Sequence, residues 1–352
     1  MKVYLHTGAG KTGTSAIQVA LARLRPQLAA AGILYPAGFK GSGDKAEQAA
    51  VSSGNAFVLG GLVNANKRRP GHDTAAVMAW LADCVRAAAG RDLLFSSEAM
   101  QSPRAPEAAE LCAFFTGAGY EVTVIHYVRH ALDQAIAGYQ QNLKRGLIGS
   151  GEREKLQDRN AFLYHEKTAY LAHLDIFAKI LPPERLIVRL YDQERSDLVA
   201  GFLRLLRPTP FVLPKAANII NRSPTAAEEI VFAELSRQPD GKRLCRTVAE
   251  LALNGPASGR ADQAVTEAEF ADFVARNQPI VDAVNSLYLK GNGELLIKSD
   301  RIVVGTVPPP APAEVYAAFA KYFALFHTGM RNRQREGRKG AKAATAQDAD
   351  RD

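Results

Sequence analysis

The sequence predicts an α/β protein with a central parallel β-sheet flanked by helices and a helical C-terminal part. Short apolar runs with strand composition alternate with longer amphipathic segments from residue 2 to about residue 206. Strands that alternate with helices pair in parallel, and helices cover both faces of the sheet. From 224 to 290 the pattern is wholly helical. We therefore expect a sheet core over 1–210 and a helical part over 215–300, together forming one domain over 1–300.

Hydrophobic period and Gly/Pro punctuation justify each element in turn. In the sheet core we expect strand 2–6, a helix from 16 to about 31, strand 32–36, helix 74–89, strand 91–98, helix 105–118, strand 120–128, helix 131–147, helix 162–180, strand 185–191 and helix 197–206. The later helices are expected near 225–236, 242–253 and 267–289. Residues 38–73, rich in Gly, Ser, Asn and Lys, predict a long excursion with a helix over about 44–52. Long loops of this kind often act as binding lids.

Composition limits the function classes. The chain has 352 residues with 47% hydrophobic content, enough for a substantial core. Its three cysteines have no paired spacing, which argues against a disulfide framework or a zinc site and favours a reducing compartment. No run approaches the ~18 apolar residues of a membrane span, and the N-terminus lacks a signal-peptide pattern, so we expect a cytoplasmic protein. A net charge of +8 suits small anionic ligands, and we expect no nucleic-acid partner.

The C-terminal region predicts a spacer, a helix and a tail. Pro308 to Pro312 form a stiff proline-rich spacer within 301–330. The aromatic residues of the following helix lie roughly on one side, and we favour docking of this side on the core over contact of residues 313–340 with a membrane surface or a partner. Residues 331–352 hold seven Lys or Arg and four Asp or Glu, and we expect this tail to be disordered.

The loop between the first strand and the first helix carries the strongest chemical signal. Residues 7–15 read Thr-Gly-Ala-Gly-Lys-Thr-Gly-Thr-Ser. Glycines let backbone N–H groups turn inward, Lys11 adds a positive charge, and Thr14 or Ser15 can cap the helix, so the loop predicts an anion site. A nucleotide-triphosphate loop needs a glycine five residues before Gly10, where this chain has Leu5, so the Walker pattern fails.

The run Lys11-Thr12-Gly13-Thr14-Ser15 resembles the 5′-phosphosulfate loop of the PAPS-dependent sulfotransferases, whose pattern is Lys-(Ser/Thr)-Gly-Thr-(Thr/Ser). This family holds the activated sulfate of 3′-phosphoadenosine-5′-phosphosulfate (PAPS) on that loop. Asn221-Arg222-Ser223-Pro224 and the paired helices after it are similar to bacterial, glycan-type members. The resemblance implies a P-loop-like sulfotransferase fold and PAPS as co-substrate, with no metal.

Two later segments match the family in part. Arg129 ends a strand and matches the arginine that grips the 3′-phosphate of PAPS, but the family's serine eight residues later is Ala137. Tyr191 and Asp192 look like the family's Tyr-Glu pair beside the adenine. Arg338-Lys339-Gly340 resembles a late phosphate clamp, but a solvated charge run explains it better. The residues that the resemblance assigns to cofactor binding are Gly10, Lys11, Thr12, Gly13, Thr14, Ser15, Arg129 and Tyr191.

Sulfuryl transfer needs a base that removes a proton from the acceptor hydroxyl. Glu98 is the favoured candidate, because it ends an apolar strand at the edge where ligands bind, and glycan and protein-tyrosine members of the family use a glutamate. His130 is the reserve candidate, whereas His6 and His126 lie inside strands and are expected to be buried and hydrogen-bonded. Lys11 is expected to neutralise charge on the bridging oxygen as the S–O bond lengthens.

These observations predict transfer of a sulfuryl group from PAPS to a hydroxyl of a carbohydrate or glycolipid. Two alternatives stay open. A nucleotide-dependent kinase would use Thr12 for Mg²⁺ and Asp192 as a second carboxylate. A module that binds nucleotides or polyanions without turnover would use the same loop.

Overall fold

The computed structural model describes residues 1–41, 54–68, 70–149, 154–207, 211–213, 222–253, 263–306, 309–325 and 327. The chain divides into two compact units, each assembled from three segments. Unit 1 comprises Met1–Ala135, Lys167–Ala217 and Val274–Ser299, and unit 2 comprises Ile136–Glu166, Asn218–Phe273 and Asp300–Asp352. Each unit therefore consists of segments that are far apart in sequence. The predicted domain limits, by contrast, divide the chain into consecutive ranges, and they stay a prediction.

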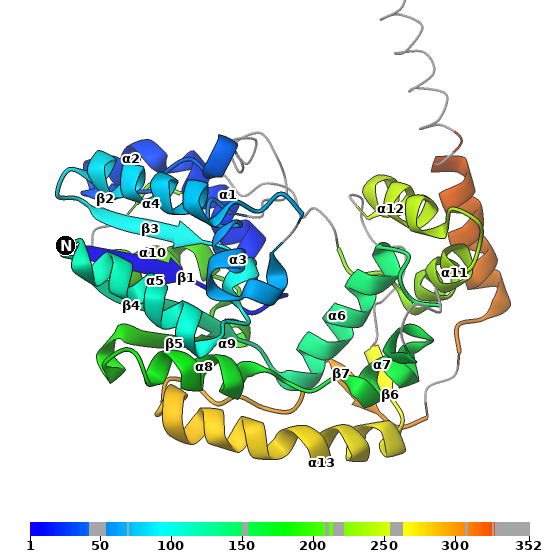
Figure 1. Ribbon diagram of the computed structural model, residues 1–352. Coiled ribbons are helices and arrows are strands. Elements are labelled where there is room, and N and C mark those ends of the chain that lie inside the picture. The colour runs from blue at the N-terminus through cyan, green and yellow to red at the C-terminus, as the bar shows by residue number, and fades with distance from the viewer. Residues whose placement is uncertain are drawn as a thin grey trace, which may run out of the picture. The chain divides into compact units, whose positions relative to one another are not determined.

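Unit 1 contains a five-stranded sheet with the order β2-β3-β1-β4-β5, and every pair of neighbouring strands is parallel. In Figure 1 the strands lie one above another in this order, with β2 at the top. Its strands are β1 Lys2–His6, β2 Ile33–Leu34, β3 Asp92–Ser96, β4 Glu121–Val128 and β5 Leu186–Leu190. The predicted α/β fold with a parallel sheet flanked by helices is confirmed.

Helices cover both faces of this sheet, because its strands are apolar on both sides. Tyr4 of β1 packs in a cluster with residues of α1 (Thr14–Arg23), α2 (Arg25–Ala30) and α10 (Leu198–Leu206). Val3 and Leu5 face the other cluster, which includes residues of α3 (Leu59–Val63), α4 (Thr74–Ala88), α5 (Ala105–Gly117) and α8 (Tyr170–Ala178). Each fully buried large apolar side chain contributes about 1.5–3 kcal/mol to folding.

Several predicted elements are broken or begin elsewhere. The first helix is two helices, because Pro26 lies in the first turn of α2 and starts a new helix after Leu24. The expected helix 162–180 is also wrong: α7 (Arg159–His165) ends where Glu166 takes an extended conformation, and α8 begins at Tyr170. Tyr191 does not end a strand, but begins the short helix α9 (Tyr191–Glu194).

Two long helices cross the boundary between the units along the chain. These are α6 (Ala131–Lys144) and α13 (Glu267–Val284), and α13 continues as a π-helical turn over Asn285–Leu289. The short 3₁₀ helices are η1 Phe39–Gly41, η3 Ala65–Lys67, η4 Glu98–Met100, η5 Glu154–Leu156 and η6 Pro183–Arg185. The predicted helix over 44–52 and the tail 331–352 lie outside the described residues.

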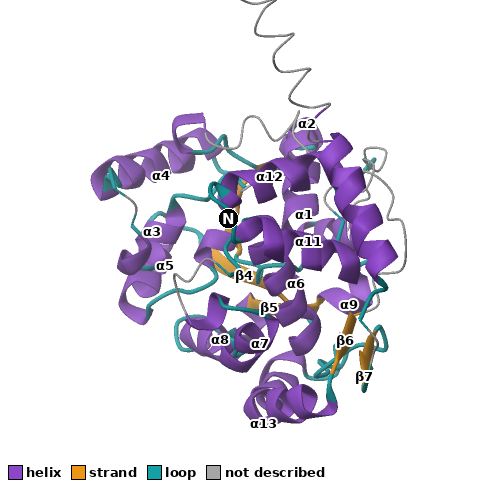
Figure 2. Cartoon of the chain, turned by 90° about the vertical axis from the view of Figure 1, so that its right-hand side faces the viewer, coloured by secondary structure: helices purple, strands orange, loops and turns teal. Residues whose placement is uncertain are grey.

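Unit 2 is helical but not wholly so. Besides α7 it holds α11 (Ala226–Ser236) and α12 (Gly241–Ala252). A pair of parallel strands, β6 (Gln263–Val265) and β7 (Ile302–Val304), lies side by side in Figure 2. The prediction that 224–290 is wholly helical is therefore wrong, because three-residue strands are too short to leave a period in the sequence.

The terminal helix over 312–325 presents two different faces. Tyr322 is buried, and its ring packs 5.7 Å from that of Phe232 in α11. Tyr316, Phe319 and Phe323 are exposed. The helix thus packs on its unit through only part of the aromatic side that the sequence indicated. Among the described helices, none is both long and apolar enough to cross a membrane.

Candidate active site

The predicted site residues follow the carboxyl ends of four adjacent strands. The loop 7–13 follows β1, Glu98 follows β3, Arg129 follows β4, and Tyr191 follows β5. The chain runs from β1 to the β3 side of the sheet and then returns to the β4 side, so the strand order reverses at β1. Ligands of open parallel sheets bind at the carboxyl ends of strands near such a reversal.

The loop after β1 contains two residues in the left-handed conformation. Lys11 has φ 68°, and Gly13 has φ 74°. For a residue other than glycine this conformation costs about 1–2 kcal/mol, so a loop that only joined a strand to a helix would favour glycine at position 11. A lysine kept under strain at a strand end is a sign of function.

The N-terminus of α1 has no side-chain cap. Gly13 occupies the N-cap position and Thr14 is the first helical residue, so the expected capping by Thr14 or Ser15 is wrong. The reason is that the helix begins at Thr14, so neither hydroxyl stands at the N-cap position; Thr14 Oγ1 lies 3.4 Å from Thr12 Oγ1, which donates to the Ala9 carbonyl at 2.6 Å. The first backbone N–H groups of an α-helix have no partner within the helix, and together with the helix dipole they attract an anion.

Two glutamines that the sequence analysis missed hold Gly10 from both sides. The Gly10 N–H donates to Gln101 Oε1 at 2.9 Å, and Gln134 Nε2 donates to the Gly10 carbonyl at 3.1 Å. Gln101 directly follows η4, and Gln134 lies in the first turn of α6. No spacing motif links these positions, because the contacts join residues 91 and 124 positions apart.

Arg129 lies against the loop. Its Nη1 donates to the Lys11 carbonyl at 3.1 Å, and its guanidinium carbon lies 5.4 Å from the centre of the Tyr191 ring. Its backbone is fixed by Tyr170, whose hydroxyl donates to the Arg129 carbonyl at 2.8 Å and accepts from its N–H at 3.1 Å. Burial raises the pKa of Tyr170, which stays protonated as this pair of hydrogen bonds requires. The structure thus brings Lys11 and Arg129 together.

Tyr191 and Gly13 are in contact. A Cβ built on Gly13 would lie 3.0 Å from Tyr191 Cε2 and only 2.2 Å from Leu198 Cδ2. The ring of Tyr191 therefore supports both the loop and Arg129, and its predicted role beside an adenine stays a prediction. Ala137 lies in the part of α6 that belongs to unit 2, and its methyl group forms no hydrogen bond of the kind the family serine would.

Asp192 positions the segment after β4. Its Oδ2 accepts from the His130 N–H at 2.8 Å, and its Oδ1 lies 3.9 Å from Arg129 Nε. His130 is buried, and its Nδ1 accepts from the Leu296 N–H at 3.0 Å. A neutral imidazole that accepts at Nδ1 carries its proton on Nε2, so His130 offers no second acceptor nitrogen. These contacts favour a positioning role for His130 over its proposed role as a base.

Glu98 begins η4, separated by one residue from the end of β3, and is half-buried. Ser97 caps this turn by accepting from the Ala99 N–H at 3.2 Å, and its own N–H donates to the carbonyl of His6 at the end of β1. Gln101, at the end of the same turn, accepts from Gly10. Glu98 therefore sits on a turn bonded to β1 and to the loop after it, and its role as a base stays a prediction.

Three buried histidines lie next to the start of the loop, His6 against Phe202 on one side of the sheet and His126 stacked on His173 on the other. His6 Nδ1 pairs with Ser96 Oγ at 2.8 Å, and Thr7 Oγ1 lies 3.0 Å from both His126 Nδ1 and His173 Nε2. Burial lowers the pKa of His6 and of His173 to about 3, and it lowers that of His126 well below its ordinary value. All three are therefore neutral at pH 7, and the expectation that His6 and His126 are buried and hydrogen-bonded is confirmed.

No family model matches the chain, and no curated protein matches it. Among solved structures, the chain is similar to the crystal structure of a sulfotransferase from Alicyclobacillus acidocaldarius. The two share 17% identity with a TM-score of 0.36, over 69% of this chain and 99% of that chain. A likeness of this size does not assign the chain to a family.

Proposed function

We propose that the chain is a PAPS-dependent O-sulfotransferase, which moves the sulfuryl group of PAPS to a hydroxyl of a carbohydrate or glycolipid. The observation that carries the proposal is the conformation of Lys11, a strained lysine in a loop that ends at an uncapped helix N-terminus. Arg129 donates to the carbonyl of this same lysine. Two cations and a helix N-terminus at one loop suit a ligand with more than one anionic group.

The residues of the loop fit the phosphosulfate end of PAPS. Gly13 lets Leu198 and Tyr191 pack directly against the helix N-terminus, where a Cβ would lie 2.2 Å from Leu198 Cδ2. Lys11 and the first N–H groups of α1 are the donors for the 5′ end, and Arg129 is the donor for the 3′-phosphate. When bound, PAPS supplies an activated sulfuryl group whose leaving group is a phosphate.

Catalysis then needs only two further actions from the chain. Glu98 takes the proton from the acceptor hydroxyl as its oxygen attacks sulfur. Lys11 donates to the oxygen that bridges sulfur and the departing phosphate, where negative charge develops. Gln101 and Gln134 hold Gly10, and thereby keep the backbone next to Lys11 in place.

The kinase alternative is disfavoured by Thr12 and Asp192. The side chain of Thr12 is fully buried, and its hydroxyl donates to the Ala9 carbonyl, so it is directed into the loop and not toward a cation outside it. Asp192 already accepts from the His130 N–H. Transfer from PAPS should persist in EDTA, whereas loss of activity that Mg²⁺ restores would support the kinase instead.

Ligand-induced thermal stabilisation tests the nucleotide. Adenosine 3′,5′-bisphosphate should raise the melting temperature far more than AMP, because Arg129 makes a charge-assisted contact, worth ~1.5–3 kcal/mol, only when the 3′-phosphate is present. The variant Arg129→Gln should remove this difference, while Arg185→Gln, a surface arginine paired with Glu121, should keep it. Equal stabilisation by the two nucleotides in the wild type would contradict the assignment of Arg129, and absence of radiolabelled sulfate transfer to any hydroxyl compound would favour a non-catalytic module.

A further inference from the structure

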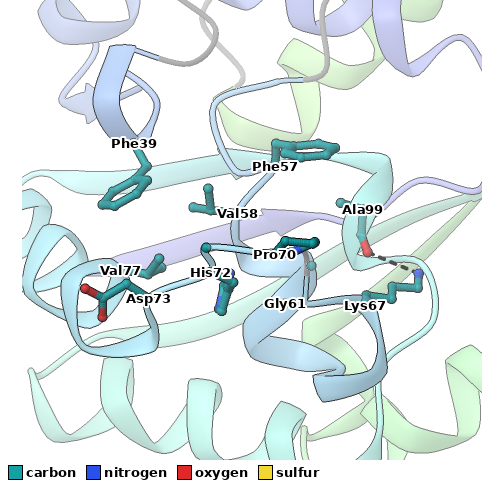
Figure 3. A pocket seen from close by; sticks show the side chains of 12 residues that line it. Phe39, Phe57, Val58, Gly61, Lys67, Pro70, His72, Asp73, Val77 and Ala99 are labelled. Carbon is teal, nitrogen blue, oxygen red and sulfur yellow. Dashed lines mark hydrogen bonds between the residues drawn. The ribbon is translucent and has the colours of Figure 1, made fainter.

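A pocket of about 440 Å³ lies beside the turn that carries Glu98, wholly within unit 1. Small-molecule sites typically measure ~300–1,000 Å³. Most of its wall is apolar, as Figure 3 shows. The described residues that line it include Phe39, Phe57, Lys67, His72, Asp73 and Ala99.

Ala99 connects this pocket to the candidate active site. It lies in η4 between Glu98 and Met100, so the residue that lines the pocket is the neighbour of the candidate base. Gln101, two positions further on, accepts from the Gly10 N–H. A molecule in the pocket therefore touches the same short turn that is bonded to the anion-binding loop.

The walls of the pocket are closely packed. A Cβ on Gly60 would lie 2.7 Å from that of Ala99, and a Cβ on Gly61 would lie 2.6 Å from Cε1 of His72. Helix α3 thus approaches η4 and His72 as closely as it does because it carries two successive glycines. The pocket is built into the packing of α3, and is not a gap between loosely placed segments.

The polar groups of the pocket favour a negatively charged ligand. Lys67 Nζ donates to the Ala99 carbonyl at 3.3 Å, and burial lowers the pKa of this lysine. The His72 Nε2 atom is buried and has no hydrogen-bond partner in the described part of the chain. The one acidic side chain among the lining residues, Asp73, accepts from the Ala76 N–H at the start of α4 and lies at the opposite end of the pocket from Lys67 in Figure 3.

We propose that this pocket binds the acceptor, and that it selects acceptors in which an apolar group adjoins an acidic group. The apolar group packs against Phe39 and Phe57, and the acidic group takes a hydrogen bond from Lys67. That the ligand of this pocket is the acceptor rests on the proposed function, whereas the chemistry of the ligand rests on the residues of the pocket alone. The pocket thus favours a glycolipid-like acceptor, with an apolar portion and an anionic group, over a bare sugar.

Binding of a matched pair of probes tests the ligand chemistry without any sulfate transfer. Calorimetry or NMR titration would compare 3-phenylpropionate with its neutral amide of nearly equal shape, and N-acetylglucosamine as a sugar without an apolar group. The wild type should bind the carboxylate about five- to tenfold more tightly than the amide, the scale of a half-exposed charge pair. The sugar should bind more weakly than either.

Two variants separate the charge from the apolar wall. Lys67→Met should abolish the preference for the carboxylate and leave amide binding unchanged, and Lys67→Gln serves the same purpose if the first variant unfolds. Phe57→Ala should weaken both phenyl probes by about three- to tenfold and keep the preference. Equal affinity for carboxylate and amide in the wild type, or a preference that survives in both Lys67 variants, would overturn the proposal.

The nucleotide provides the control that separates this proposal from the proposed function. Adenosine 3′,5′-bisphosphate should stabilise the wild type, Lys67→Met and Phe57→Ala equally, because neither residue belongs to the loop after β1 or to the segment of Arg129. Absence of nucleotide binding together with the expected probe preference would overturn the acceptor role and the proposed function while leaving the ligand chemistry of the pocket intact. In a transfer assay 3-phenylpropionate should compete with the acceptor and not with PAPS.

Discussion

The three buried histidines next to the start of the loop should make unit 1 unstable in mild acid. In the folded state burial keeps His6, His126 and His173 neutral, because it lowers the pKa of each far below the ordinary value near 6.5. In the unfolded chain each would gain a proton as the pH falls through that ordinary value. The unfolded state then binds more protons than the folded state, so the free energy of unfolding falls as the pH falls.

The magnitude follows from the pKa of each histidine in the folded and unfolded states. A histidine with a pKa of about 3 when folded gains no proton between pH 7.5 and 5.5, whereas the unfolded histidine becomes mostly charged. Each such residue lowers the free energy of unfolding by about 1.4 kcal/mol between pH 7.5 and 5.5. His6 and His173 together lower it by about 3 kcal/mol, and His126 lowers it further. A loss of about 3–4 kcal/mol is a large part of the stability of an ordinary domain.

Urea unfolding monitored by tryptophan fluorescence measures this effect in unit 1. The chain contains one tryptophan, Trp80, whose ring packs 5.8 Å from Phe95 of the central sheet. His173→Gln should reduce the difference in unfolding free energy between pH 7.5 and 5.5 by about 1.4 kcal/mol, since one proton uptake is lost. His165→Gln, at a partly exposed position in unit 2, is the matched control, because Trp80 reports on the unfolding of unit 1. A wild-type stability that is equal at the two pH values, or higher at pH 5.5, would refute the reasoning.

Three substitutions test the loop and the base. Gly13→Ala should cost about 2–4 kcal/mol of unfolding free energy and weaken binding of adenosine 3′,5′-bisphosphate, because the new Cβ would meet Leu198 at 2.2 Å in a left-handed conformation. Gly90→Ala is the control, because Gly90 has φ 85° and no atom lies within 4 Å of the new Cβ. It should lower the unfolding free energy by only about 1 kcal/mol, the cost of the left-handed backbone conformation. Lys11→Gly should raise the unfolding free energy by about 1 kcal/mol, because it relieves the strained backbone, and should lower kcat for sulfate transfer about 10²–10³-fold. A variant that loses stability as well as rate would contradict the interpretation that the strain at Lys11 is kept for function. Glu98→Gln should lower kcat roughly 10²–10⁴-fold with unchanged nucleotide affinity and melting temperature, and full turnover in this variant would require a different base.

Local patterns were sufficient for the predictions that concern a single strand and the residues next to it. Lys11, Glu98 and Arg129 each follow an apolar run, and in a parallel sheet the carboxyl ends of all strands lie at one edge. The positions of these residues at one edge could therefore be predicted before any contact was known. Their roles in catalysis and binding stay predictions, which the experiments above test.

Contacts between distant segments could not be predicted in this way. Gln101 and Gln134 have no motif of their own, and their role exists only because the folded sheet brings both to Gly10. The expected capping of α1 by Thr14 or Ser15 failed for a related reason: the backbone turns left-handed at Gly13, which then takes the N-cap position itself.

By itself, the sequence determined the parallel α/β sheet, the glycine-rich loop after the first strand and the absence of the Walker glycine, because all three depend on hydrophobic period and on spacing along the chain. Only the tertiary structure decided that Arg129 holds the carbonyl of Lys11, that neutral histidines lie next to the start of the loop, and that an apolar pocket with Lys67 adjoins the turn of Glu98. The physical reason is that burial and hydrogen-bond partners are properties of neighbours in space, and those neighbours come from segments between 32 and 118 residues apart.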